Sequence, residues 1–325
     1  MTLGDLPVWY LRLLAICWGA CWGSFANVAI YRWPNELSLV RPGSHCPHCG
    51  KPVRGYDNVP ILAWLWLRGR CRDCKAPISP RYPLVEGIYA LAAFALMERL
   101  WRGDPSQAMS VGFALFFARF AFAWGLLTAA FIDLETLLIP DFISISGTVI
   151  GIAVSAFLPG VGLRMSLLGA GLGFAIPFSL WFIWSRLLKR EGMGLGDAKL
   201  LAMIGALLGP AGVLFSLSVG SMQGIIATVV SRVTGWKLGP EHAWDEDEDD
   251  EDEAHAGERD AAVEATVEAK PDEAKPDDAK PDEDEDPGLM RTRIPFGPFL
   301  ALGALEYLLG ADAWVAEYLR WVTGG

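Results

Sequence analysis

Acidic residues are scarce in most of this sequence, because 22 of its 38 Asp and Glu residues lie between Asp245 and Pro287. Only 4 Lys and Arg residues accompany them, so this segment has a net charge of −18 (4 minus 22). The whole chain has a net charge of −11, which leaves +7 for the remainder (−11 plus 18). With 52% hydrophobic residues and a mean hydropathy of +0.30, the body of the chain is basic and strongly apolar. Such a composition is unusual for a soluble domain.

A signal-peptide cleavage pattern is also absent. The first apolar run extends from about Val8 to Ile30, its basic residues lie mostly after it, and no small-residue cleavage pattern follows. This absence argues against a segment that is removed from the mature protein. Because a membrane crossing needs roughly 20 residues, we expect the run to be a retained transmembrane helix.

Long apolar runs, by contrast, are abundant. Seven more follow, at about Leu84 to Leu100, Met109 to Ile132, Phe142 to Leu158, Leu163 to Leu188, Leu200 to Leu208, Ala211 to Val230 and Phe296 to Leu309. Several of the 14 tryptophans lie near the ends of such runs, as they do in the aromatic belts of membrane proteins. The predicted fold class is an all-α polytopic membrane protein with about eight transmembrane helices.

Residues 31–83 form a polar loop with nine Lys and Arg residues and few acids, which favours a cytoplasmic location. Two CxxC motifs in this loop, Cys46 with Cys49 and Cys71 with Cys74, are separated by 21 residues. Paired motifs of this kind indicate one tetrahedral zinc ion held by four thiolates. The alternatives are disulfides, which a reducing cytoplasm disfavours, and a redox pair, for which one CxxC suffices. We therefore predict a zinc-stapled loop.

Two aspartates border apolar runs. Asp197 follows a turn that contains Gly194 and Gly196, and glycines there let the backbone approach a bound chain closely. Asp133 ends the run that begins at Met109. Ionisable groups bordering transmembrane segments are costly and indicate function by default. We predict that Asp133 and Asp197 share a proton and activate a water; for Asp197, capping of the following helix is the alternative.

Three other charged residues lie near this predicted pair. Lys199 either lowers the pKa of Asp197, or holds a substrate carboxylate, or is a helix-end lysine that reaches toward the membrane interface. Glu135 and Asp141 are rival carboxylates, although Asp141 follows Pro140 at an expected helix start, where an N-cap explains it. Gly194, Gly196 and Lys199 are our candidates for substrate binding.

The parity of the apolar runs gives a consistent orientation. If the zinc loop is cytoplasmic, the third run returns Asp133 to the cytoplasmic side. The fifth run returns there too, ending at Arg186, Lys189 and Arg190 just before Asp197. Both aspartates and the acidic segment are thus expected on the side of the zinc loop.

The acidic segment opens with nine consecutive acids and closes with a five-residue repeat that begins Lys-Pro-Asp. Its composition cannot support a core, so it is either a solvated linker or an electrostatic tether. We divide the chain into a first helix (1–30), the zinc loop (31–83), a membrane-embedded core (84–240), the acidic insertion (241–290) and a last helix with its tail (291–325).

Short motifs along nearly the whole chain, the insertion excepted, resemble those of the type IV prepilin peptidases. They are Gly23-Ser24-Phe25-Ala26-Asn27-Val28, Tyr31-Arg32-Trp33-Pro34, Cys46-Pro47-His48-Cys49, Asp57-Asn58-Val59-Pro60-Ile61, Cys71-Arg72-Asp73-Cys74, Ile78-Ser79-Pro80-Arg81-Tyr82-Pro83-Leu84-Val85-Glu86, Ile132-Asp133, Ile139-Pro140-Asp141, Gly194-Leu195-Gly196-Asp197-Ala198-Lys199 and Ile294-Pro295-Phe296-Gly297-Pro298. The long acidic insertion departs from the family, which usually has a short connection there.

The resemblance implies a bifunctional enzyme of the bacterial inner membrane. It implies that Asp133 and Asp197 are an aspartic dyad that cuts basic leaders from prepilins and pseudopilins, between Gly and usually Phe. It also implies N-methylation of the new terminus with S-adenosylmethionine. No Gly-rich nucleotide fingerprint locates that donor, and the zinc loop is our candidate only because it is the largest polar element. The expected partners are prepilins and the lipid bilayer, with no nucleic acid.

Two other classes remain open at this point. A different intramembrane aspartic protease, such as a presenilin-like enzyme, would share the GxGD motif but would not need the zinc loop. A non-catalytic membrane scaffold would use the two aspartates only as helix caps. The product of incubation with a prepilin separates all three readings.

Overall fold

The computed structural model describes residues 1–187, 194–235 and 295–323, without the side chains of residues 187 and 323. These residues form helices and three isolated bridges, with no strand among them. The all-α prediction is confirmed. The acidic insertion lies outside the described residues, as do Lys189 and Arg190.

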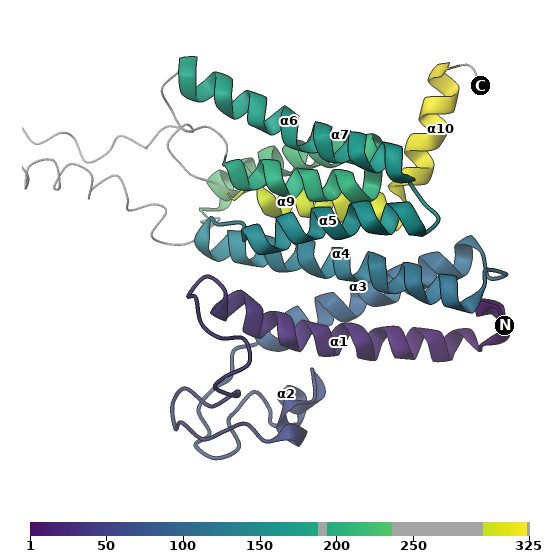
Figure 1. Ribbon diagram of the computed structural model, residues 1–325. Helices are drawn as coiled ribbons and strands as arrows, with labels where there is room; N and C mark the ends of the chain where they lie inside the picture. Colours follow the sequence, from purple (N-terminus) through teal and green to yellow (C-terminus); the bar gives the residue numbers. More distant parts are fainter. Residues whose placement is uncertain (188–193, 236–294, 324–325) are drawn as a thin grey trace, which may run out of the picture.

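The N-terminal part consists of α1 (Val8–Arg32), a loop that contains the short helix α2 (Leu62–Trp66), and α3 (Arg81–Gly103). Helices α1 and α3 pack along each other. Close packing needs the glycine at position 23, since a β-carbon there would lie 2.7 Å from the α-carbon of Glu86 on α3. The loop between them lies outside the bundle, below α1 in Figure 1.

The middle of the bundle is formed by α4 (Met109–Thr136) and α5 (Asp141–Phe157), followed by α6 (Leu163–Leu187) and α7 (Leu195–Thr234). Figure 1 shows these helices running roughly parallel or antiparallel to α1 and α3. Helix α6 packs closely against α7.

Helix α7 contains both of the short runs predicted separately at Leu200 to Leu208 and Ala211 to Val230. Its axis breaks at Gly209, which has φ 73° and ψ −176° and precedes Pro210. Pro210 has no N–H for the carbonyl of Ala206, four residues earlier. The hydroxyls of Ser155 on α5 and Ser166 on α6 donate to that carbonyl instead, at 3.1 and 2.5 Å. The carbonyl that is left free at the break is therefore hydrogen-bonded by neighbouring helices. The two halves of α7 form a hairpin-like pair.

The C-terminal part begins with α9 (Gly297–Glu306), continues through a π-helical stretch (Tyr307–Ala311) and ends with α10 (Asp312–Thr323). The direction changes at Gly310, where φ is 163°. Arg99 on α3 pairs with Asp312 at this bend. Figure 1 shows α10 projecting from the bundle at the end where the N-terminus lies.

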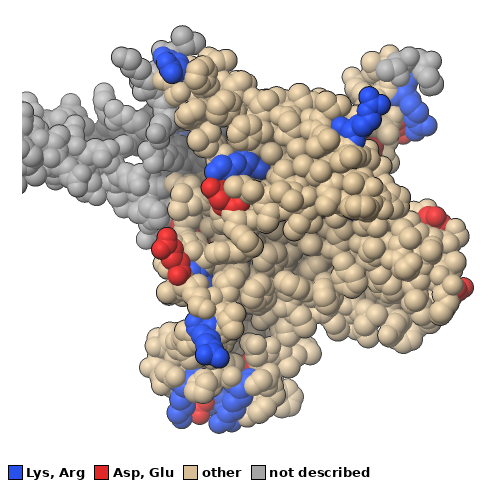
Figure 2. All heavy atoms as spheres, viewed as in Figure 1, with Lys and Arg blue, Asp and Glu red and all other residues tan. Residues whose placement is uncertain are grey.

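Within the described residues, five helical segments are long and apolar enough to cross a membrane, and Asp141–Phe157 is a shorter apolar helix. The five are Val8–Arg32, Met109–Thr136, Leu163–Arg186, Leu195–Thr234 and Gly297–Val322. Helix α3 is not among them. A polytopic membrane protein is thus supported, while the count of eight spans stays a prediction. Figure 2 agrees, since most of the surface between the ends of the bundle is uncharged and Lys and Arg gather on the loop below α1.

Candidate active site

Asp133 lies in the last turn of α4 and is 5% exposed. Its Oδ2 atom accepts a hydrogen bond of 2.9 Å from the backbone N–H of Gly297, at the start of α9. A buried carboxylate needs such a donor. The contact joins two segments that are 164 residues apart in sequence.

Gly297 has no room for a side chain. A β-carbon at this position would lie 2.6 Å from Oδ2 of Asp133, closer than real β-carbons approach a neighbour. The glycine of the Pro-Phe-Gly-Pro motif therefore lets the backbone reach the carboxylate. The sequence analysis identified this motif but gave its glycine no role.

Asp197 lies in the first turn of α7 and is 8% exposed. The carboxyl groups of Asp133 and Asp197 are close enough for their charges to interact. The fold thus brings together the two aspartates that were paired from the sequence. Gly194 occupies the N-cap position of α7 and is exposed, and its backbone carbonyl accepts the N–H of Asp197 at 3.2 Å.

Ile139, in the connection between α4 and α5, lies beside both Gly196 on α7 and Gly297 on α9. A β-carbon at Gly196 would lie 3.1 Å from the Ile139 β-carbon, and one at Gly297 would lie 3.1 Å from Ile139 Cδ1. One aliphatic side chain therefore packs against the glycines that neighbour both carboxylates. The site has an apolar side chain on this side, which lowers the local polarity and strengthens electrostatic interactions within it.

The rival carboxylates are engaged elsewhere. Glu135, two residues after Asp133, pairs with Arg81 at the start of α3. Asp141 accepts a hydrogen bond of 2.6 Å from Nζ of Lys199, and its side chain is 58% exposed. Lys199 thus contacts Asp141, a partner that the sequence analysis did not consider for it. Burial separates Asp133 and Asp197 from both rivals.

The four cysteines of the loop converge as predicted. Their sulfur atoms all lie within 4.8 Å of one another, and the Sγ atoms of Cys46 and Cys74 are 3.7 Å apart. A tetrahedron with metal–sulfur bonds of about 2.3 Å has edges of about 3.8 Å. The donor set and its spacing therefore fit a zinc ion.

The two CxxC motifs have the same backbone geometry. In each, the residue four positions after the first cysteine donates its N–H to that cysteine's carbonyl, Gly50 to Cys46 at 2.9 Å and Lys75 to Cys71 at 3.0 Å. Both donors have positive φ, 69° and 61°. In the second motif, the N–H groups of Cys74 and Asp73 lower the pKa of the Cys71 thiol to about 7, whereas, despite the N–H of Ala76, burial and the neighbouring cysteines raise the pKa of the Cys74 thiol to about 11. Cys71 is therefore the cysteine of this motif that becomes a thiolate most readily.

Polar contacts attach this loop to the bundle. Glu86 on α3 accepts the N–H of Ile61 at 2.7 Å, and Ile61 has φ 62°, a strained value for a β-branched residue. Within the loop, Asp57 accepts two hydrogen bonds from Arg72, at 2.5 and 2.7 Å, and these lower the pKa of Asp57. The Asp57 motif thus braces the second CxxC motif.

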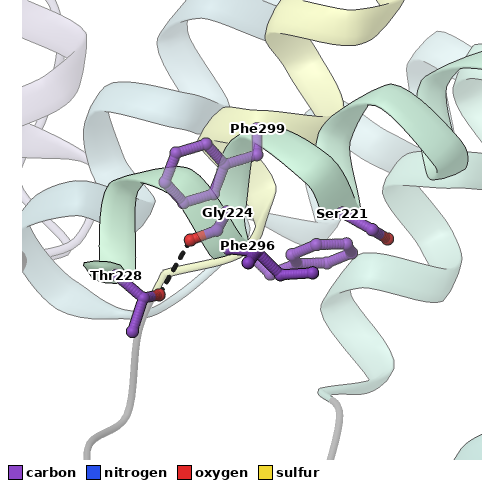
Figure 3. Close-up of a pocket in the computed structure, with 6 residues that line it drawn as sticks. Ser221, Gly224, Thr228, Phe296 and Phe299 are labelled. Atoms are coloured by element: carbon purple, nitrogen blue, oxygen red, sulfur yellow. Dashed lines mark hydrogen bonds between the residues drawn. The ribbon is translucent and has the colours of Figure 1, made fainter. Parts of the chain in front are cut away.

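An apolar groove lies between the second half of α7 and the start of α9 (Figure 3). Its volume is about 290 Å³. The lining residues are Ser221, Gly224, Ile225, Thr228, Phe296 and Phe299. Phe296 directly precedes Gly297, the donor to Asp133.

Comparison with known proteins gives two family matches. Residues 17–100 match the bacterial peptidase A24 N-terminal domain, and residues 120–229 match the type IV leader peptidase family. No solved structure matches the chain.

Similar proteins carry consistent names. A prepilin leader peptidase/N-methyltransferase of Myxococcus xanthus is 34% identical, over 98% of this chain and 96% of that protein. One from Aeromonas hydrophila is 36% identical over 67% of this chain and 81% of that protein, and one from Stutzerimonas stutzeri is 30% identical over 95% and 93%. The matches extend over both the cysteine loop and the aspartate-bearing helices, and the chain belongs to the type IV leader peptidase family.

Proposed function

We propose that this protein cuts the basic leader from type IV prepilins or pseudopilins, between Gly and usually Phe, and then N-methylates the new terminus. The observation that carries the proposal is the buried pair Asp133 and Asp197, held in a chain similar to leader peptidase/N-methyltransferases over almost its full length. Such an enzyme serves the assembly of type IV pili or type II secretion pseudopili.

The two carboxylates have the properties that peptide hydrolysis needs. Two neighbouring buried carboxylates cannot both be ionised cheaply, so they share one proton and titrate as a unit. One takes a proton from the attacking water while the other donates to the scissile carbonyl. The N–H of Gly297 fixes the orientation of Asp133. Gly194 provides open backbone next to Asp197, where an extended substrate chain binds, and Gly196 gives room for Ile139 to pack beside it.

The location of the pair suits the substrate. The ends of α4 and α6, the starts of α7 and α9, and the cysteine loop all lie toward one end of the bundle in Figure 1. We propose that this end is cytoplasmic, because the loop is rich in Lys and Arg. The basic leader then stays in the cytoplasm and the apolar helix in the bilayer, with the peptide bond between them at the aspartates. The acidic insertion belongs to the same side.

We assign Cys46, Cys49, Cys71 and Cys74 to one structural zinc ion. The loop is too small for a core of its own, so the metal supplies much of its folding free energy.

The methyl donor is S-adenosylmethionine, which supplies the transferred methyl group. Its site belongs in our proposal to the zinc loop, the largest polar element. A cavity of about 360 Å³ beside Cys71 is lined by Arg68, Arg70 and Lys75. These cations fit the donor's carboxylate, although they do not favour its sulfonium.

Incubation of the purified protein with a prepilin and S-adenosylmethionine tests the proposed function. The expected product begins with the residue after the Gly and carries one methyl group, as N-terminal sequencing and mass spectrometry would detect. Omission of S-adenosylmethionine should leave cleavage intact and remove only the methyl group. Cleavage that is never followed by methylation indicates another aspartic protease, and no cleavage indicates a scaffold.

The Lys199–Asp141 ion pair joins the starts of α7 and α5, on either side of Ile139. We expect Lys199→Asp or Asp141→Lys to slow cleavage by ~2- to 5-fold, because the pair is largely exposed. The double exchange should restore most of the rate. Cleavage kinetics of the three variants provide the measurement. If Lys199→Asp is not rescued by the second exchange, Lys199 acts on the substrate and not through Asp141.

A further inference from the structure

The groove between α7 and α9 is formed by regularly spaced side chains. Ser221, Gly224, Ile225 and Thr228 are three, four and seven positions apart, so they share one face of α7. Phe296 and Phe299 close the opposite side (Figure 3). Gly224 leaves open the space in front of the Phe299 ring, from which a β-carbon would be 3.5 Å away.

Apart from the hydroxyls of Ser221 and Thr228, the lining is apolar. The hydroxyl of Thr228 already donates to the carbonyl of Gly224 in its own helix, at 2.7 Å. Among the described residues, none with a charged side chain lines the groove. Its volume of about 290 Å³ is at the small end of the range for ligand pockets. The groove therefore suits one or two apolar side chains and disfavours a basic leader.

The groove is linked to the aspartate pair through two consecutive residues. Phe296 lines it, and the next residue, Gly297, donates its N–H to Asp133. Its other side opens outward, since Ile225 is 66% exposed on a helix that is apolar enough to span a membrane. An apolar chain in the bilayer can thus reach the groove laterally while a neighbouring peptide bond lies at the aspartates.

On the basis of the proposed function, we propose that this groove binds the first apolar side chains after the scissile bond of the prepilin. Binding there anchors the substrate helix against α7 and α9 and sets which peptide bond reaches Asp133 and Asp197. Ile225, Phe296 and Phe299 are the positioning residues of this site. A lipid chain, or the chain's own residues between 235 and 295, are the other occupants that the experiment separates.

The decisive variant fills the groove. Ile225→Trp should raise the KM for a full-length prepilin about tenfold or more, since it prevents burial of about one apolar side chain of the substrate. The kcat should change less than twofold, because the aspartates are untouched. Ile226→Trp is the matched control, since Ile226 is adjacent, 55% exposed and not part of the lining.

A second substrate distinguishes a loss of substrate docking in the groove from damage to the active site. A short peptide that contains the leader and the cut bond, but has small polar residues in place of the first apolar residues after the cut, presents no apolar side chain to the groove. We expect Ile225→Trp and the wild-type protein to cleave this peptide with similar kcat/KM. Ile225→Ala, which removes a wall instead of filling the space, should weaken only the full-length substrate.

The outcomes are distinct. An equal loss with both substrates means that Ile225→Trp perturbs the active site, and it overturns the docking proposal. No change with either substrate overturns it as well and leaves the groove to lipid or to the chain itself. If the wild-type protein does not cleave the prepilin at all, the proposed function is wrong. A negative result with the groove variants alone contradicts only the docking proposal.

Discussion

Asp133→Asn and Asp197→Asn are each expected to abolish prepilin cleavage, with a loss of about 100- to 10,000-fold or more. Each substitution removes a group that must exchange a proton in the reaction, and general acid–base catalysis contributes roughly that factor. The asparagine has nearly the same shape, so the protein should still accumulate in the membrane. The measurement is single-turnover cleavage of a purified prepilin, together with the amount of membrane-inserted enzyme.

Asp141→Asn and Glu135→Gln serve as controls, because both carboxylates are engaged in ion pairs away from the buried pair. They should retain cleavage within about fivefold, as expected for partly exposed ion pairs. If Asp133→Asn or Asp197→Asn instead cleaves at a near-normal rate, the dyad assignment is wrong. Loss of cleavage in Asp141→Asn alone would then place the catalytic carboxylate at the start of α5.

The two aspartates could be found from the sequence because a charged group next to an apolar run is costly. Their partnership could be inferred from membrane topology, which put both on one side. The third component of the site could not be found in this way. The N–H of Gly297 reaches Asp133 across 164 residues, and a backbone amide leaves no signature in the sequence beyond a glycine.

The role of Ile139 next to the aspartates could not be predicted from the sequence either. An isoleucine before Pro-Asp looks like an ordinary linker residue, and only its packing against Gly196 and Gly297 shows what it does. The ion pair of Lys199 with Asp141 was missed because both residues had local explanations, one as a helix-end lysine and one as a cap. Local explanations cannot reveal a contact between two helix starts.

The apolar runs predicted separately at Leu200 to Leu208 and Ala211 to Val230 correspond to the two halves of α7, and the backbone turns between them at Gly209. Ser155 and Ser166 satisfy the carbonyl that Pro210 leaves free at this break. Hydropathy separates the two runs, but it does not report these supporting side chains from α5 and α6.

The cysteine loop contacts α3 through the hydrogen bond of Ile61 to Glu86, and Arg81 at the start of α3 pairs with Glu135 on α4. Because Glu135 is two residues from Asp133, the junction of the loop with α3 touches the end of α4, but it contributes no side chain to the aspartate pair. The Asp133–Gly297 contact is independent of the loop. Loss of the loop's order should therefore affect a reaction at the loop more than the reaction at the aspartates.

Replacement of Cys46, Cys49, Cys71 or Cys74 by Ser is expected to remove most of the bound zinc and to destabilise the loop. Structural zinc in small domains contributes about 10 kcal/mol or more of apparent binding free energy, and an incomplete thiolate set forfeits much of it. Methylation or protein stability should decrease more than peptide-bond cleavage, because the loop contributes no side chain to the aspartate pair. Elemental analysis, protease sensitivity of the loop and separate assays of cleavage and methylation provide the readouts.

Cys17→Ser and Cys21→Ser are the matched controls, since both cysteines are exposed on α1 and lie outside the four-cysteine cluster. They should keep the wild-type zinc content and both activities. A wild-type protein without zinc would end the metal assignment. If zinc is lost but methylation persists at the normal rate, the metal is structural and the methyl donor binds outside the loop. If cleavage falls as steeply as methylation, the Arg81–Glu135 contact transmits the order of the loop to the end of α4, and Arg81→Gln should then reproduce the cleavage defect with its zinc intact.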